Sequence, residues 1–281
     1  MRAKTWVAVM SGWALAASAC AGPGNPAPPP GLTYRLPDPP AAAYRMADTV
    51  QVGIQAMGQA FSVAGGARSD WRMEFALDAG GVRVTATLLD LDARMSNPLG
   101  PDQTVDETEV AGQVVFVLDQ RGNPTVVSVP ELGSGAAQFF TGSTIANGFF
   151  PRLPGRALAP GESWVDTVSY TSDDAGAEST VRTVWTYTAA GDSAVAGSVY
   201  QLVRASGQTE QSSGGTIAGT DFTQSVAGAV TGHFLWDGAV GMLHSSEYHS
   251  VLSGESVISI APVPLEVRVR SVVRVERTPT P

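Results

Sequence analysis

The sequence predicts an all-β protein with minor α content. We expect an antiparallel meander that forms either two similar lobes or one long curved sheet resembling a half-barrel, with a short central helix. Apolar and polar side chains alternate, as at Val50, Val52 and Ile54, which is the period of a half-buried strand. Glycine, aspartate, asparagine and serine interrupt these runs at intervals of roughly 8 to 15 residues, as expected for antiparallel strands.

The clearest single element is a hairpin in the first half of the chain. Two β-branched runs, Val114–Leu118 and 125–129, flank a turn that contains Gly122, Asn123 and Pro124. Such runs around glycine, asparagine and proline are a strong hairpin signal. The same reasoning predicts further strands at residues 50–54, 61–64, 71–77, 82–91, 164–170, 180–188, 199–205, 222–226, 233–236, 242–252 and 265–275.

The centre of the chain carries the predicted helix. Small residues around the Phe139-Phe140 pair predict a helix over residues 136–145, although glycine and threonine lower its propensity. The aromatic and proline-containing segment that follows, 149–156, is interpreted as the connection between two halves.

We expect five parts along the chain. These are a signal peptide at 1–19, a lipidated cysteine with a proline-rich tether at 20–43, an N-terminal β lobe with the short helix at 44–148, a C-terminal β lobe at 149–277, and a tail at 278–281. Proline fixes φ and removes a backbone donor, so the tether is expected to be extended and semi-rigid.

The N-terminus has the pattern of a secretory signal. Arg2 and Lys4 precede a mostly apolar stretch, 5–16, and small residues lead up to Cys20. The apolar stretch is shorter than the roughly 20 residues that a spanning helix needs. Two forms of such a signal are possible. One is an ordinary signal peptide cut nearby, which would leave a free thiol on Cys20, and the other is the signal of a lipid-anchored protein.

The residues before Cys20 resemble the lipobox of bacterial lipoproteins, although Ala17 stands where that motif usually has leucine. The resemblance implies a diacylglycerol thioether on Cys20, cleavage before it, and acylation of the new amine by a fatty acid such as palmitate. Several acyl chains hold a protein firmly on a membrane. Ala21, rather than aspartate, follows the cysteine, which by resemblance to enteric sorting rules implies the outer membrane, facing the periplasm.

Composition excludes several kinds of chemistry. The 281 residues carry a formal net charge of −9, which disfavours a nucleic-acid partner. Lys4 is the only lysine and lies in the predicted signal peptide, so Schiff-base and phosphate-loop chemistry are excluded from the mature chain. Cys20 is the only cysteine, so stability has to come from an apolar core rather than from disulfides.

Two short motifs resemble a family of uncharacterised bacterial lipoproteins, a domain of unknown function. They are Phe149-Phe150-Pro151 and the strand start Pro160-Gly161-Glu162-Ser163-Trp164, and the segment from Gly232 to Gly241 is similar too. The resemblance implies an envelope location and a β-rich fold, and it carries over no catalytic residue. From the residues themselves, Pro160-Gly161 makes a turn and Trp164 fills the core.

No catalytic residue, metal site or cofactor is predicted. His233, His244 and His249 lack the spacing of a zinc site, and we favour hydrogen-bonded or solvated histidines. Asp90 and Asp92 lie two apart and would share one face of a strand, where they could bind calcium or act as acid and base. Solvated outward charges are the interpretation that we prefer.

The last expected strand carries the clearest patterned surface. Along residues 267–276 valines alternate with charged residues, which include Arg268, Arg270 and Arg274. An arginine stripe could bind a ligand or partner through carboxylate or phosphate groups. Cross-strand pairing with acidic neighbours, or protection of a sheet edge, is the interpretation that we favour.

The functional expectation is a membrane-anchored, non-enzymatic envelope lipoprotein that binds a hydrophobic ligand or an envelope component through a concave β surface. Large curved sheets often hold apolar ligands inside. The alternative is a structural or scaffold lipoprotein that docks on a membrane-protein partner. The third is an envelope hydrolase with Asp90, Asp92 or the His244–His249 strand at its site.

Overall fold

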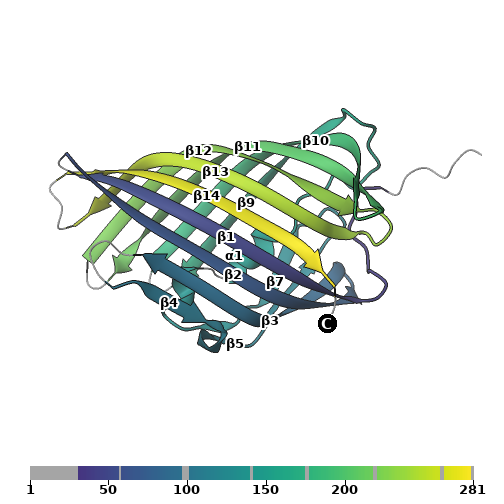
Figure 1. The fold of residues 1–281 in the computed structure, drawn as a ribbon, viewed down its shortest axis with the longest axis horizontal. Coiled ribbons are helices and arrows are strands. Elements are labelled where there is room, and N and C mark those ends of the chain that lie inside the picture. The colour runs from purple at the N-terminus through teal and green to yellow at the C-terminus, as the bar shows by residue number, and fades with distance from the viewer. Residues whose placement is uncertain are drawn as a thin grey trace, which may run out of the picture.

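The structure is a computed structural model that describes residues 31–56, 58–96, 101–139, 142–174, 177–217, 220–259 and 263–279. Within these ranges twelve strands form one antiparallel sheet, in the order β7-β6-β3-β2-β1-β14-β13-β12-β11-β10-β9, with β4 paired to β3 (Figure 1). The strands of this sheet are β1 (Ala41–Ala56), β2 (Gln59–Asp78), β3 (Gly81–Ser96), β4 (Gln103–Asp106), β6 (Val114–Leu118), β7 (Pro124–Ser128), β9 (Ser163–Asp174), β10 (Ala177–Val195), β11 (Ser198–Ile217), β12 (Thr220–Asp237), β13 (Met242–Ile258) and β14 (Leu265–Thr278).

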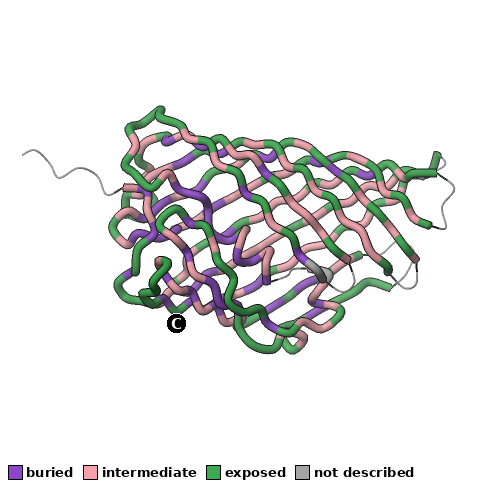
Figure 2. Tube along the Cα trace, turned by 180° about the vertical axis from the view of Figure 1, so that it is seen from behind, coloured by how far each residue is buried: buried purple, intermediate pink, exposed green. Residues whose placement is uncertain are grey.

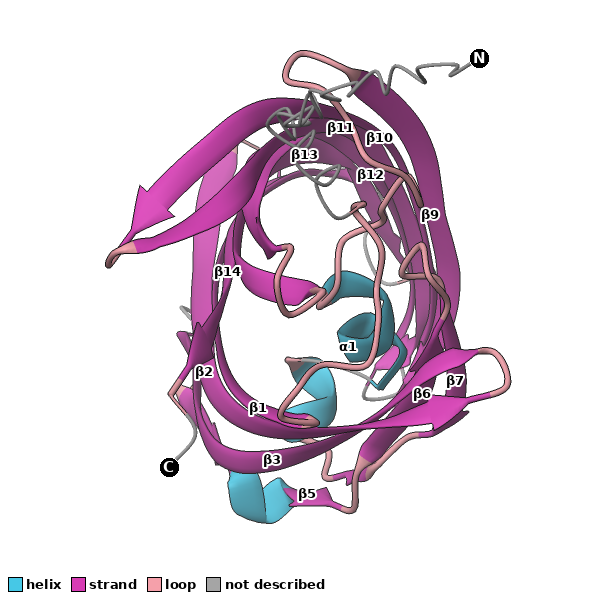
Figure 3. Cartoon of the chain, turned by 90° about the vertical axis from the view of Figure 1, so that its right-hand side faces the viewer, coloured by secondary structure: helices cyan, strands magenta, loops and turns pink. Residues whose placement is uncertain are grey.

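This arrangement confirms the all-β prediction and decides between its two forms. The first and last strands pair, with Asp48 of β1 opposite Val273 of β14, so the two expected lobes are the two ends of one sheet. The sheet curls around an interior and stays open, because β7 and β9 end it and do not pair with each other (Figure 3). A small second sheet consists of β5 (Val110–Ala111) and β8 (Glu131–Leu132).

The strands are longer than the alternation predicted, because glycines that indicated breaks lie inside them. The expected strands 222–226 and 233–236 are two parts of β12, with Gly228 and Gly232 between them. A Cβ on Gly228 would overlap the carbonyl oxygen of Val251, and one on Gly232 would overlap that of Glu247. These glycines therefore mark places where neighbouring backbones approach closely and the sheet can bend.

The predicted hairpin is confirmed as β6–β7. The Asp119 carboxylate holds its turn, accepting hydrogen bonds of 2.8 Å from the backbone amides of Arg121 and Asn123. Gly122 adopts φ 83°, a conformation that favours glycine. Pro124 opens the outgoing strand at the sheet edge, where its missing N–H costs no ladder hydrogen bond.

The short helix exists, but its bounds differ from the predicted 136–145. A 3₁₀ turn, η2, covers Ala136–Gln138, and the α-helix α1 covers Gly142–Gly148; a second 3₁₀ turn, η1, covers Glu107–Glu109. Helix α1 lies on the concave side of the sheet and contacts β6, β7 and β9 (Figure 3). Burial of Ile145 and Ala146 in that interior outweighs local propensity and moves the helix toward the aromatic segment.

The segment interpreted as a connection, 149–156, enters the core instead of running over the surface. Phe149 and Phe150 are each 1% exposed. Their rings pack on Tyr44 with centroid distances of 5.3 and 6.0 Å. Buried segments concentrate toward one end of the curved sheet, where this segment fills the interior (Figure 2). Burial of two phenylalanines favours this course over a solvent-exposed one.

The N-terminal part that the structure describes also packs into this end. Leu32 and Tyr34 are each 2% exposed, and the Tyr34 hydroxyl donates a 2.8 Å hydrogen bond to the Pro151 carbonyl. Residues 31–43 of the expected tether thus differ from a free spacer, and β1 already begins at Ala41. The predicted signal peptide and Cys20 lie outside the described residues. Within the described ranges, no helix has the length and hydrophobicity needed to cross a membrane.

Candidate functional site

The candidate site is a cavity of about 250 Å³ inside the curved sheet, beside α1. Strands from both ends of the chain contribute to it, together with α1 and the segment after it. Its lining is mostly apolar and aromatic, with a few polar groups. The residues that line it include Met46, Asp48, Ile145, Phe150, Arg152, Val181, Trp185, Tyr187, Tyr248 and Val273.

Sheet register explains how distant residues meet at this cavity. Asp48 on β1 pairs with Val273 on β14, which pairs with Tyr248 on β13, so the three lie in one row on the concave face. The row continues through Gly232, Ala205 and Tyr187. Gly232 and Ala205 are small, so they leave space in this row. The rings of Tyr187 and Tyr248 and the Asp48 carboxyl group border that space.

Aromatic rings form one wall of the cavity. The Trp185 ring lies 5.6 Å from that of Tyr187 at an interplanar angle of 23°, and 5.2 Å from that of Tyr248. Burial raises the pKa of the Tyr187 phenol well above its ordinary value; Tyr248 raises it further and Arg152 lowers it. These contacts place the phenols of Tyr187 and Tyr248 and the Arg152 guanidinium in one electrostatic neighbourhood.

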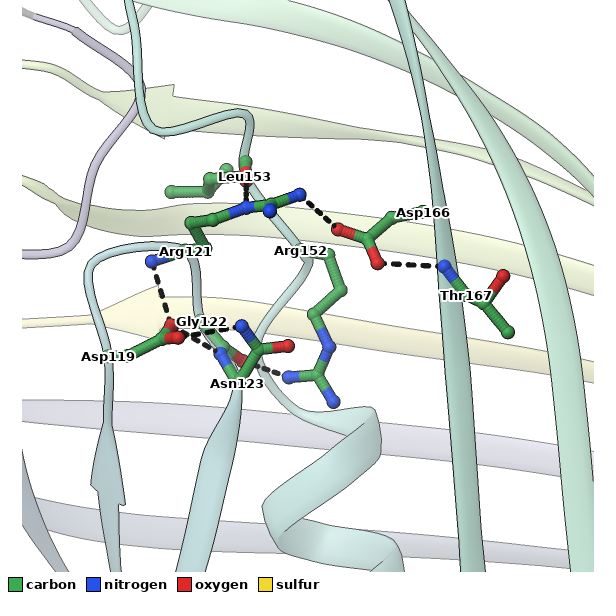
Figure 4. Close-up of polar contacts among 8 residues, drawn as sticks. All are labelled: Asp119, Arg121, Gly122, Asn123, Arg152, Leu153, Asp166 and Thr167. Atoms are coloured by element: carbon green, nitrogen blue, oxygen red, sulfur yellow. Dashed lines mark hydrogen bonds and ion pairs between the residues drawn. The ribbon is translucent and has the colours of Figure 1, made fainter.

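Arg152 is the buried cation of the site, with 4% of its surface exposed. It donates to the Gly122 carbonyl, drawn in Figure 4, and at 3.2 Å to the Asn147 side-chain oxygen. Burial lowers the pKa of its guanidinium. Among the described residues, no carboxylate forms an ion pair with it. A buried charge without a counter-charge is costly, which makes Arg152 a candidate functional residue.

Two donors at the cavity have no hydrogen-bond partner among the described residues. They are the Tyr248 hydroxyl and the Nε–H group of Arg152, both buried. A buried donor without an acceptor costs about 1–3 kcal/mol. Both belong to residues that line the cavity, so an acceptor atom of a bound molecule could satisfy them.

Asp48 contributes the carboxyl group of the cavity. It faces the interior from β1, between the apolar side chains of Met46 and Val50 on the same face. Burial raises the pKa of this carboxyl group to about 6. Near neutral pH the cavity therefore holds a carboxylate whose solvation is incomplete.

We expect Asp48→Asn to stabilise the protein at pH 7.5 by about 2 kcal/mol. The pKa of Asp48 is about 6 in the fold, above that of an unfolded chain. Between pH 4 and pH 6 the fold keeps a proton that the unfolded chain has released, so this group lowers the free energy of unfolding as pH rises. Urea unfolding at pH 4 and pH 7.5 measures the difference.

The gain from Asp48→Asn should shrink to about 0.5 kcal/mol at pH 4, where the wild-type carboxyl group is protonated in the fold and about half protonated in the unfolded chain. Asp92→Asn is the matched control, because Asp92 is exposed and pairs only with Arg94 at 3.0 Å on the surface. It should change the free energy of unfolding by less than about 0.5 kcal/mol. An equal gain at both pH values for Asp48→Asn would show that titration is not the cause.

The sheet is open along a seam between its two edge strands, β7 and β9. An ion pair bridges this seam beside the site. Arg121, in the β6–β7 turn, donates to Asp166 of β9 at 2.9 Å (Figure 4). Burial acts to raise the pKa of Asp119, but its hydrogen bonds with Asn123 and Arg121 outweigh burial and lower it. This ionised carboxylate holds the turn that presents Arg121 across the seam.

The arginine stripe predicted as a weak ligand or partner site lies on the convex face, away from the cavity. Arg268, Arg270 and Arg274 are exposed on β14. Arg274 donates to Glu247 of β13 at 2.7 Å, and Glu247 also contacts His249 at 2.7 Å. Strand β14 lies between β1 and β13, so the stripe does not protect a sheet edge.

The candidate hydrolase residues are not brought together. Asp90 and Asp92 are exposed on β3, while His244 and His249 lie on β13, with β2, β1 and β14 between these two strands. His244 stacks on Tyr200 with a centroid distance of 4.0 Å. Within the described residues, no group of three or more histidine, cysteine or carboxylate side chains could hold a metal ion.

Sequence reasoning missed the residues that line the cavity. One signal was present, because Asp48 is a polar residue on the apolar face of an alternating run. Arg152 and Tyr248 gave no such signal. Their burial depends on a loop course and a strand register that local patterns do not determine.

Comparisons with known proteins give weak similarities. No protein-family model and no curated protein matches the chain. Among solved structures it is similar to Neisserial surface protein A (9% identity, 84% of this chain and 98% of that chain, TM-score 0.24). It is also similar to OccK2 (OpdF) of Pseudomonas aeruginosa (9%, 87% and 100%, TM-score 0.29) and to the hypothetical lipoprotein YmcC of Escherichia coli K12 (14%, 83% and 85%, TM-score 0.22). At these TM-scores the similarities carry no functional argument, and the fold class rests on strand pairing.

Proposed function

We propose that the chain is a lipid-anchored protein of the bacterial envelope that binds a hydrophobic ligand inside its curved sheet, without catalysing a reaction. The observation that carries the proposal is the apolar and aromatic cavity beside α1. Its volume, about 250 Å³, lies just below the roughly 300–1,000 Å³ of typical ligand pockets, which fits one chain or ring rather than a whole lipid.

The concave face beyond the cavity supports the same function. Strands β1, β2 and β14 present half-buried aliphatic side chains there, namely Val50, Val52, Ile54, Val63 and Val269. The hydroxyl groups between them pair with each other, as Ser250 with Ser271 at 2.8 Å and Thr183 with Thr209 at 2.9 Å. An apolar chain could lie along this face without leaving those hydroxyls unpaired.

Ligand binding is tested by blocking the cavity. Val181→Trp should fill part of the cavity and abolish binding, because Val181 lines it. Val165→Trp is the matched control, since Val165 is 62% exposed on the edge strand β9. Native mass spectrometry of gently purified protein and thermal shift with added lipid are the measurements. If the wild-type protein carries no lipid and shows no lipid-induced shift, the proposed function is wrong.

The membrane anchor is tested separately at Cys20. Cys20→Ser should move the protein from the membrane fraction to the soluble fraction and abolish incorporation of labelled palmitate, because several acyl chains are needed for stable anchoring. Cell fractionation with the wild-type chain in parallel measures both effects. Identical sedimentation of the two proteins, without palmitate on the wild type, would remove the anchor from the proposal.

A scaffold that docks on a membrane-protein partner is the second candidate, and exposed apolar residues at one sheet edge favour it. Val126 and Val127 of β7, with the adjacent Val129, are 40%, 50% and 53% exposed. A photo-crosslinking residue at position 127 should then capture a membrane protein in intact cells. The same probe at position 165, on the opposite edge strand, serves as the control. Equal, weak labelling from both positions would argue against docking through β7.

A further inference from the structure

The polar groups of the cavity lie in two places, a cluster around Arg152 and the separate carboxyl group of Asp48. Their positions indicate which kind of ligand the cavity can bind. Tyr187 is influenced electrostatically by Tyr248 and Arg152, and Arg152 by Tyr187, Tyr34, Asp166 and Asp119. Asp48 lies in the same row as Tyr248, with Val273 of β14 between them. Arg152, Tyr187 and Tyr248 therefore form one polar cluster, and the Asp48 carboxyl group borders the same cavity apart from it.

The polar cluster has donors in excess of acceptors. The Tyr248 hydroxyl and the Nε–H group of Arg152 have no partner among the described residues. The two carboxylates that act on Arg152 are occupied elsewhere: Asp166 accepts from Arg121 at 2.9 Å, and Asp119 accepts from its own turn. The unpartnered Nε–H group of a buried cation and an unpartnered buried hydroxyl favour an anionic oxygen as their acceptor.

We propose that the cavity binds an amphiphilic carboxylate, with its head group hydrogen-bonded by Tyr248 and Arg152 and its alkyl chain along the apolar concave face. This inference rests on the proposed function and specifies its ligand. A carboxylate accepts several hydrogen bonds at once, so it can satisfy both free donors and form the direct ion pair that Arg152 lacks among the described residues. The alkyl chain would contact Val181 and Val273, which line the cavity beyond the head group.

Three probes with the same tail separate the possible ligand classes. Octanoate, 1-octanol and octylamine are titrated against the purified full-length protein, with intrinsic tryptophan fluorescence and calorimetry as readouts. Octanoate should bind at least about tenfold more tightly than 1-octanol, because hydrogen bonds to a charged group are stronger than those to a neutral one. Octylamine should bind more weakly than either, since Arg152 repels it.

Tyr248→Phe is the decisive variant. The Tyr248 hydroxyl has no partner among the described residues, so its removal should leave the urea unfolding midpoint of the ligand-free protein unchanged or raise it. Octanoate affinity should fall about tenfold, while 1-octanol affinity changes much less. Tyr200→Phe is the matched control, because Tyr200 stacks on His244 and does not line the cavity. Arg152 is less suitable, since it also holds Gly122 and Asn147.

Asp48→Asn independently tests the sign of the charge on the ligand head group. Removal of this carboxylate should raise octanoate affinity at pH 7.5 and lower octylamine affinity. Equal binding of octanoate and 1-octanol, preference for octylamine, or an unchanged octanoate affinity in Tyr248→Phe would each overturn the carboxylate inference and leave hydrophobic binding in place. Failure of all three probes, together with no lipid in native mass spectrometry, would overturn the proposed function itself.

Discussion

Phe150→Ala is expected to lower the free energy of unfolding by about 4 kcal/mol. The Phe150 ring is 1% exposed and lies 5.8 Å from the Tyr34 ring, 6.0 Å from Tyr44, 6.1 Å from Phe116 and 5.1 Å from Phe149. These neighbours come from the N-terminal segment, β1, β6 and the end of α1. No single one of them can move into the space that the ring leaves, so the substitution creates a cavity.

Urea unfolding followed by tryptophan fluorescence measures this loss. Leu77→Ala removes an aliphatic side chain that is 76% exposed, and it should change the free energy of unfolding by less than about 0.5 kcal/mol. A loss below about 1 kcal/mol for Phe150→Ala would contradict the placement of the 149–156 segment in the core. Because Phe150 also lines the ligand cavity, the variant should admit bulkier ligands at the temperature where it remains folded.

Gly254→Ala is expected to cost about 3 kcal/mol, although alanine usually suits a strand better than glycine. Gly254 lies on β13, and a Cβ there would overlap the carbonyl oxygen of Ser225 on β12. Because that atom belongs to the backbone of a paired strand, relief requires the two strands to move apart. The sheet would then lose some of the bend that forms its concave face.

Gly214→Ala provides the comparison, because its Cβ would lie 3.5 Å from the nearest atom, the Phe222 carbonyl oxygen, at an ordinary contact distance. Gly214 belongs to β11, so both substitutions add one methyl group to a paired strand. The control should change the urea midpoint little or raise it slightly. Equal destabilisation by both substitutions would show that strand propensity, rather than close approach of β12 and β13, determines the effect.

The local features of the fold could be read from the sequence. Alternation at Val50, Val52 and Ile54 predicted a strand, and the Gly122-Asn123-Pro124 turn predicted a hairpin, because side-chain period and turn geometry are properties of a few adjacent residues. It was harder to predict from the sequence that a long strand continues through a glycine. A glycine such as Gly228 reads as an interruption unless the close approach of the neighbouring strand is known.

The candidate site shows the same division. Sequence by itself determined the all-β class and the presence of a short central helix. Tertiary structure decided that β1 pairs with β14, that the segment after α1 turns inward, and that Arg152 and Tyr248 border one cavity. The physical reason is that strand pairing and burial depend on residues that are far apart in the chain. Tyr44 and Leu243 are 199 positions apart, and the hydroxyl of the first lies 2.9 Å from the carbonyl oxygen of the second.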